Sequence, residues 1–245
     1  MTIENDHDLE CLRYVGAIVR DVLAHMGSFV RPGITTAELD AIGEKELARA
    51  GVRSAPRLAY NFPGATCISV GEEAAHGIPG ARVLREGELV NIDVSAEKDG
   101  YWADTGGSFA VGTVSPHHRK LCRDTKTALR KAVFVARAGQ PINAIGRVVE
   151  RQARLGGYSV VPDLAGHGVG RFIHEAPSVP NYFDPQNRER LKEGMVIAIE
   201  PFLTTGSGDI FEDADGWTLK TADGAPVAQY EHTVVITRGN PIILT

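Results

Sequence analysis

Four acidic side chains lie within or beside apolar stretches of the sequence, where an ionised group is costly to bury. They are Asp93, Asp104, Glu200 and Glu231. A carboxylate that enters the interior of a sheet must be paired or coordinated. A structural ion pair is the ordinary explanation for any one of them, but few lysine or arginine residues occur in the same stretches. A pair of divalent metal ions would neutralise all four.

Three histidines have settings that suit a site built on rigid loops. His76 and His167 each precede a glycine, and His174 follows the glycine-rich run around His167. A lone histidine is usually not a ligand, so their joint placement carries the argument. Oxygen ligands with one or two histidines suit Mn, Fe, Co or Zn in a two-metal hydrolytic site, whereas structural zinc prefers sulfur. Two such ions can polarise a carbonyl and anchor a substrate amine, which indicates an aminopeptidase.

Four helices are predicted to frame these residues, at about residues 9–26, 35–51, 115–139 and 142–155. The first and third carry apolar side chains at three- and four-residue intervals, the spacing that places them on one helix face. Thr35 and Glu38 match a capping box, and Gly51 and Gly139 are placed to end the second and third helices.

The acidic residues themselves adjoin predicted strands. Residues 89–111 contain two apolar runs broken at Lys98-Asp99-Gly100, which predicts a hairpin with Asp93 and Asp104 on opposite arms. Further strands are predicted at residues 195–199 and 227–237.

An internal repeat relates two of the carboxylates. Residues 84–93 and 191–200 align without a gap, and each copy ends in a carboxylate, Asp93 or Glu200. A His-Gly pair precedes each copy, at residues 76–77 and 167–168. We therefore predict one catalytic domain made of two pseudo-symmetric halves, about residues 1–112 and 113–245, with the site between them.

The composition argues against several classes of protein. Of the 245 residues, 43% are hydrophobic and 23% charged, as in ordinary globular proteins. The formal net charge of −5 argues against a surface that follows nucleic-acid phosphates. The acidic start of the sequence is unlike a signal peptide, and no window approaches a membrane span. Three cysteines without paired spacing fit a reducing compartment, so we expect a cytoplasmic protein.

Several short runs of this sequence occur together in one known family. They are Tyr60-Asn61-Phe62-Pro63, Cys67-Ile68-Ser69-Val70, His76-Gly77-Ile78-Pro79, Val90-Asn91-Ile92-Asp93-Val94, Gly166-His167-Gly168-Val169-Gly170-Arg171, Ile199-Glu200-Pro201, Asp215-Gly216-Trp217 and Gln229-Tyr230-Glu231-His232-Thr233. As a set they resemble the type I methionine aminopeptidases, from about Leu9 to the end of the chain. The resemblance implies the pita-bread fold, an α/β (α+β) arrangement of pseudo-twofold duplicated half-domains with a curved antiparallel sheet flanked by helices.

The resemblance also implies a ligand set. Asp93 and Asp104 would bind one metal, His167 and Glu200 the other, and Asp104 and Glu231 would bridge them. The two divalent ions could be Mn, Co, Fe or Zn, since these ligand types accept several metals. The reaction implied is removal of the initiator methionine from proteins and peptides with a small second residue.

Catalytic and binding roles follow from the same resemblance. Hydroxide held by the two metals would attack the first peptide bond while Glu200 relays the proton, and His76 and His174 would contact the scissile amide and the developing oxyanion. The methionine pocket would be lined by Phe62, Cys67, His76, Ile173 and Trp217.

The sequence departs from the family pattern at four positions. Ile173 replaces a common phenylalanine, and Ala59 replaces a pocket aromatic. Gly71 and Glu73 stand where asparagine and an apolar residue are usual. These changes put the shape of the pocket in doubt, and they leave open whether a monovalent cation binds near residues 71–73.

Two other interpretations compete with methionine removal. An Xaa-Pro peptidase would share the fold and the metal ligands, but its large amino-terminal domain does not fit before His76. A metal-free adaptor with this fold would have lost ligands, whereas all five are present. The expected partners are nascent polypeptide amino termini, with no nucleic acid and no membrane. We expect a monomer, and contact with the ribosome stays open.

Overall fold

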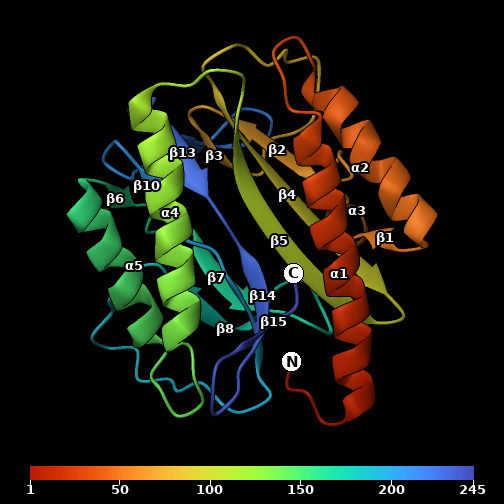
Figure 1. Ribbon diagram of the computed structural model, residues 1–245, viewed down its shortest axis with the longest axis vertical. Coiled ribbons are helices and arrows are strands. Elements are labelled where there is room, and N and C mark those ends of the chain that lie inside the picture. The colour runs from red at the N-terminus through yellow and green to blue at the C-terminus, as the bar shows by residue number, and fades with distance from the viewer.

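Helices pack on antiparallel sheets in the computed structural model, which describes residues 1–245 (Figure 1). The helices are α1 (Asp6–Ser28), α2 (Thr36–Ala50), α3 (Ala55–Tyr60), α4 (Pro116–Val135) and α5 (Asn143–Gly156). The strands are β1 (Arg53–Ser54), β2 (Cys67–Val70), β3 (Glu73–Ala75), β4 (Leu89–Lys98), β5 (Tyr101–Ala110), β6 (Ser159–Val160), β7 (Ala165–Gly168), β8 (Glu175–Pro180), β9 (Val196–Ile199), β10 (Phe202–Thr204), β11 (Ile210–Glu212), β12 (Leu219–Thr221), β13 (Val227–Gln229), β14 (His232–Val235) and β15 (Ile242–Ile243). All of the strand pairings are antiparallel, so the predicted fold class is confirmed.

The first sheet contains the predicted hairpin. Its strand order is β1-β4-β2, with β5 paired to β4. β4 and β5 pair along their whole length, from Leu89 opposite Ala110 to Lys98 opposite Tyr101. α1 crosses this sheet (Figure 1), and its apolar stripe forms a core with the strands. That core holds the hairpin rigid behind the residues that β4 and β5 present on the other face.

The helix boundaries predicted from capping signals are mostly confirmed. Thr35 and Glu38 form the reciprocal capping box at the start of α2, and Gly51 ends the helix with φ +67°, a conformation that favours glycine. α4 starts as predicted at Ser115 but ends at Val135 rather than at Gly139. The four residues 136–139 leave the helix because the amides of Ala138 and Gly139 donate to Thr237 and Leu191 instead. None of the helices combines the length and the hydropathy that a membrane crossing requires.

A five-stranded sheet with the order β15-β14-β9-β7-β8 lies beside the first. α4 and α5 pack against each other and, with this sheet, enclose a second core. Figure 1 shows the two helices side by side over the strands of the C-terminal part of the chain. Two smaller sheets, β13-β10-β6 and β11-β12-β3, complete the structure.

The predicted strand at residues 227–237 is wrong as one element. It forms two strands, β13 and β14, which belong to different sheets. The break falls at Tyr230 and Glu231, because Tyr230 forms a bridge with Gly107 and the Glu231 amide donates to the Gly106 carbonyl at 2.9 Å. This crossing joins the two large sheets at the point where Glu231 lies.

The two copies of the internal repeat have matching local structures. Gly87 and Gly194 both have positive φ, +92° and +80°. The Gly87 amide donates to Val111 at 2.9 Å, and the Gly194 amide donates to Ile236 at 2.8 Å. Each copy then enters a strand, β4 or β9. The division of the chain near residue 112 stays a prediction.

Candidate metal centre

The hairpin β4–β5 brings Asp93 and Asp104 to one face of the first sheet. Asp93 lies opposite Gly106 in the register of the two strands, and Asp104 is two residues from Gly106, so both side chains point to the same side. Cys67 of β2 lies opposite Asp93 on its other flank. A Cβ at Gly106 would lie 2.4 Å from the side-chain oxygen of Gln229, so only glycine leaves room for the site's other wall.

The other three predicted ligands come from the second large sheet and its crossing. His167 lies on β7, Glu200 directly follows β9, and Glu231 lies between β13 and β14. Together with the hairpin residues and His174, these side chains form three sets of possible ligands. Within each set, all the ligand atoms lie within 4.8 Å of one another. The sets are Asp104 with His167 and His174, His167 with Glu200 and Glu231, and Asp93 with Asp104 and Glu231. The structure therefore brings all five predicted ligands together, with His174 beside them.

The carboxylates of this cluster lack protein counter-charges. No lysine or arginine forms an ion pair with any of the four, and their only ion-pair partner is His167, which is 3.7 Å from Asp104 and 3.5 Å from Glu200. Two buried oxygens, Oδ1 of Asp104 and Oε1 of Glu231, have no hydrogen-bond donor. A buried carboxylate oxygen without a hydrogen-bond donor is unfavourable unless a cation binds it. The donor set and its missing partners therefore fit divalent metal ions.

The acid groups respond to this environment with raised pKa values. Burial raises the pKa of Asp93 to about 6. Burial and the neighbouring carboxylates hold the pKa values of Asp104, Glu200 and Glu231 well above their usual range. Loss of hydration and repulsion between like charges both disfavour the ionised forms, and bound cations would reverse this preference.

His167 is oriented as a metal ligand would be. Its Nδ1 lies 2.9 Å from the Gly168 carbonyl oxygen, to which it donates a hydrogen bond. Nε2 therefore faces Asp104 and Glu200 with a free lone pair. Burial lowers the pKa of His167 to about 4, so the ring is neutral at physiological pH and can coordinate a cation.

A chain of amides fixes Glu231. The Gln229 side-chain amide donates to Glu231 Oε2 at 3.1 Å, and Asn91 donates to the Gln229 side-chain oxygen at 2.8 Å. Asn91 lies on β4, 138 positions away from Gln229. Sequence reasoning missed both amides as positioning groups, because only the crossing of the two sheets brings them together.

An apolar cavity of about 300 Å³ opens beside the carboxylates. All five predicted pocket residues line it, together with His174, Asp93 and Asp104. The rings of Phe62 and Trp217 meet edge to face with centroids 5.1 Å apart. His76 holds a left-handed backbone conformation with φ +57°, which is uncommon outside glycine and marks a residue held in place by its surroundings.

Tyr60 is a site residue to which the sequence analysis assigned no role. It lines the cavity, and its Oη lies 2.6 Å from Nδ1 of His174, 114 positions away in the chain. Tyr60 therefore contributes an aromatic ring to the cavity and contacts His174 at the same time. The short helix α3, which the sequence analysis did not predict, ends at Tyr60. The run Tyr60 to Pro63 was a signal for this residue, but its contact depends on tertiary structure.

Comparisons with known proteins place this geometry in a family. A family model described as metallopeptidase family M24 matches residues 10–238. The chain belongs to metallopeptidase family M24. It is 47% identical over 247 residues to methionine aminopeptidase 2 of Bacillus subtilis strain 168, covering 100% of this chain and 99% of the relative. It is 46% identical to a methionine aminopeptidase of Staphylococcus epidermidis, with 100% of this chain and 98% of the relative covered.

Solved structures of M24 proteins agree with the fold. The methionine aminopeptidase of Thermotoga maritima superposes with a TM-score of 0.96 at 32% identity, over 100% of this chain and 99% of that chain. Prolidase from Pyrococcus furiosus superposes with a TM-score of 0.81 at 24% identity, but this chain covers only 65% of it. The second likeness concerns the fold alone.

Proposed function

We propose that this M24 protein removes the initiator methionine from proteins and peptides whose second residue is small. The observation that carries the proposal is a single site in which a metal-binding cluster adjoins an apolar cavity. Asp93 and Asp104 belong to both. A substrate whose first side chain fills the cavity would therefore hold its first peptide bond over the cluster. The relatives named methionine aminopeptidase support the same assignment.

Two divalent metal ions would be held by the five ligands. We propose Asp93 and Asp104 for one ion, His167 and Glu200 for the other, and Asp104 and Glu231 as bridges. When bound, such ions lower the pKa of water and polarise the substrate carbonyl. Manganese, cobalt, iron and zinc all suit these ligands.

We leave a monovalent cation near residues 71–73 out of the proposal. Arg82 already lies 3.2 Å from a carboxylate oxygen of Glu73. The carbonyls of Gly71 and Glu72 accept hydrogen bonds from the Val227 and Thr221 amides. These groups are therefore satisfied by the protein itself.

Proton transfer falls to Glu200. Its carboxyl is buried, lies 3.5 Å from His167, and has a pKa held well above its usual range. Cations bound beside it would favour its ionised form, and this carboxylate could then accept a proton from the attacking water and pass it to the leaving amine. His76 and His174 line the cavity beside Asp93 and Asp104, so they can donate to the amide and to the oxyanion that forms during attack.

The methionine side chain would occupy the cavity between Cys67 and Trp217. A thioether is polarisable and packs well on sulfur and on aromatic edges. The ring of Phe62 packs edge to face against Trp217. Ile173 is buried and lines the same cavity. The cavity volume of about 300 Å³ leaves room for an unbranched side chain as long as methionine.

Tyr60 would position His174 for this reaction. Burial raises the pKa of Tyr60 and lowers that of His174 to about 3, so at neutral pH the phenol keeps its proton and the imidazole is neutral. The phenol can then donate to Nδ1, which places the remaining imidazole proton on Nε2. That tautomer is the one able to donate into the site.

Replacing Tyr60 by phenylalanine is expected to lower kcat on a Met-Ala peptide by about tenfold. KM should change less than twofold, because the ring that lines the cavity remains. Steady-state kinetics of the metal-loaded variant measures both constants. Tyr14→Phe, at an exposed tyrosine on α1, is the matched control. An unchanged kcat for Tyr60→Phe would remove Tyr60 from the mechanism.

The activity itself is tested on paired peptides. Metal-stripped protein is supplied with Mn, Co, Fe or Zn and incubated with peptides that begin Met-Ala or Ala-Pro, and the released amino acid is identified. We expect metal-dependent release of methionine only. Release of alanine before proline would assign an Xaa-Pro activity instead. No release with any metal would mean that the protein lacks aminopeptidase activity.

We further propose that the protein acts as a monomer on nascent polypeptide amino termini in the cytoplasm, where initiator methionine is first exposed. The cavity and the cluster are formed by a single chain, which supports a monomeric active form. Contact with the ribosome is not needed for the chemistry proposed here.

A further inference from the structure

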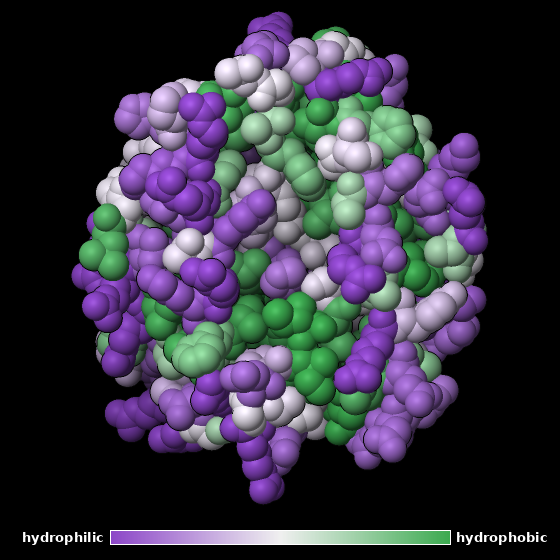
Figure 2. All heavy atoms as spheres, in the orientation of Figure 1, coloured by the Kyte–Doolittle hydropathy of each residue, from purple (hydrophilic) through white to green (hydrophobic).

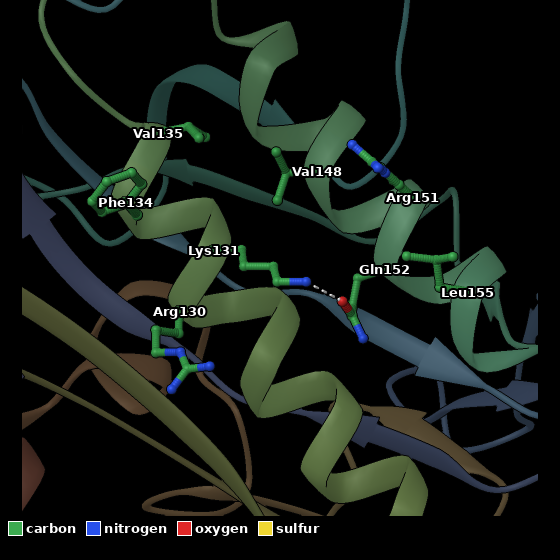
Figure 3. Close-up of a pocket in the computed structure, with 8 residues that line it drawn as sticks. All are labelled: Arg130, Lys131, Phe134, Val135, Val148, Arg151, Gln152 and Leu155. Atoms are coloured by element: carbon green, nitrogen blue, oxygen red, sulfur yellow. Dashed lines mark hydrogen bonds between the residues drawn. The ribbon is translucent and has the colours of Figure 1, made fainter.

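A groove of about 490 Å³ runs between α4 and α5. It shares no residue with the cavity beside the metal ligands. Figure 3 shows Lys131 of α4 reaching Gln152 of α5 across it, through a hydrogen bond of 2.7 Å. The residues that line it are Arg130, Lys131, Phe134, Val135, Val148, Arg151, Gln152 and Leu155.

Apolar side chains in this groove are unusually exposed. Leu155 is 71% exposed and Phe134 is 62% exposed, the two highest values among the large hydrophobic residues of the protein. Both line the same groove, beside Val135 and Val148. Figure 2 shows apolar surface among hydrophilic side chains over α4 and α5. Exposed apolar residues that gather in one groove are typical of a binding surface.

The same two helices are strongly basic, although the whole chain has a formal net charge of −5. α4 and α5 together contain nine lysine and arginine residues and two acidic ones. Both acids are already paired, Asp124 with Lys120 at 2.9 Å and Glu150 with Arg154 at 3.8 Å. Six exposed basic residues have no carboxylate within 4.0 Å, namely Arg119, Lys126, Arg130, Lys131, Arg147 and Arg151.

We propose that this groove binds an acidic amphipathic helix of a partner protein. A helix in a groove is held by apolar side chains at intervals of three and four residues, which Phe134, Val148 and Leu155 can receive. Arg130 and Arg151 stand on the two sides of the groove and can pair with Glu or Asp on the flanks of that helix. This partner satisfies both features of the surface at once.

The apolar component distinguishes this partner from RNA. A surface for RNA is dominated by phosphate contacts, with bases stacked on aromatic rings. RNA would gain nothing from exposed Leu155 or from half-buried Val148. Phe134 is also covered on one side by the Arg137 guanidinium, 4.7 Å from the ring centroid. The groove thus favours a protein segment, and because it is separate from the cavity, the partner can stay bound while substrates enter and leave.

The probe for this surface is a fluorescent designed peptide of about 18 residues, with leucine on one helical face and glutamate elsewhere. Its binding to the full chain is followed by fluorescence anisotropy. A peptide of the same composition with the leucines scattered around the helix measures charge attraction alone. We expect the amphipathic peptide to bind at least about tenfold more tightly than the scattered one.

Two groove variants and one control complete the test. Phe134→Ser/Leu155→Ser removes the apolar contacts, and Arg130→Glu/Arg151→Glu reverses the charge. Each is expected to weaken binding at least about tenfold. Arg13→Glu/Arg31→Glu makes the same charge change at exposed positions elsewhere and should leave binding within twofold. Thermal unfolding confirms that the variants are folded.

Three results would overturn the proposal. The first is equal binding of the two peptides, which would reduce the groove to a charged surface. The second is tighter binding of an RNA hairpin that is lost in Arg130→Glu/Arg151→Glu but kept in Phe134→Ser/Leu155→Ser. The third is a dimer in sedimentation velocity that dissociates in Phe134→Ser/Leu155→Ser, because the occupant would then be a second copy of the chain.

Discussion

Replacing Asp104 by asparagine is expected to lower metal-dependent methionine release by on the order of a thousandfold, the scale on which preorganised electrostatic stabilisation acts. Asp104 belongs to two of the three ligand sets and is proposed to bridge the two ions. Asparagine keeps its shape but removes the charge that would hold them. Activity is measured on a Met-Ala peptide across a range of metal concentrations.

The same substitution is expected to raise the melting temperature of the metal-free protein. Asp104 is buried with one unpartnered oxygen, and burial followed by repulsion from Glu231 and Asp93 holds its pKa well above its usual range. A neutral amide carries no charge to repel these neighbours and needs no bound proton to stay neutral. In the wild type, added metal should stabilise the fold, and in Asp104→Asn this gain should be small.

The control for both effects lies in the same hairpin. Asp99 is in the turn between β4 and β5, its side chain is 79% exposed, and its φ of +51° suits asparagine. Asp99→Asn should therefore leave both activity and melting temperature unchanged. If Asp104→Asn kept wild-type activity after removal and return of metal, the ligand assignment would be wrong.

The metal-free protein is expected to lose stability as the pH rises above about 6.5. Asp104, Glu200 and Glu231 have folded-state pKa values raised well above their ordinary values by burial and by one another. The folded chain then holds protons that the unfolded chain has released, so stability falls with increasing pH.

Below pH 6.5 two opposing effects overlap. Asp93, whose pKa is raised to about 6, still makes stability fall as pH rises from about 4. His167 and His174 act in the opposite sense, because burial lowers their pKa values to about 4 and about 3. The unfolded histidines bind protons first, so stability is lost as pH falls below 6.5. The interval from pH 6.5 to 8.5 is therefore the diagnostic one.

Melting temperatures at pH 6.5 and 8.5 measure this effect, with chelator and with saturating manganese. The chelated protein should melt at a lower temperature at pH 8.5, and manganese should remove most of the difference because bound cations keep the carboxylates ionised. Asp104→Asn should show a smaller fall in chelator. A chelated wild type that is equally stable at both pH values would contradict the raised pKa values.

The four acidic ligands could be predicted from the sequence because their signal is local, whereas His167 was assigned as a ligand through the family resemblance. A carboxylate at the end of an apolar run, such as Asp93 or Glu200, is expensive wherever the strand goes, so a cation could be inferred without knowing the fold. The hairpin could be predicted in the same way, because Asp99 and Gly100 mark its turn. The structure then brought the expected residues together.

Other features depend on contacts between distant segments, which no local pattern records. Tyr60 meets His174 across 114 positions, and Asn91 meets Gln229 across 138. The strand breaks at Glu231 because the Glu231 amide bonds to Gly106 of the other large sheet. The apolar sequence pattern continues across this break and therefore does not reveal it. The net charge of −5 gave no indication of the basic face of α4 and α5, because a total charge does not show where the charged residues lie.

The most direct test of the metal centre is anomalous diffraction from crystals soaked in manganese. We expect two anomalous peaks, one in contact with Asp93 and Asp104 and the other in contact with His167 and Glu200, with Asp104 and Glu231 in contact with both. A peak elsewhere, or none at these side chains under conditions that support methionine release, would contradict it.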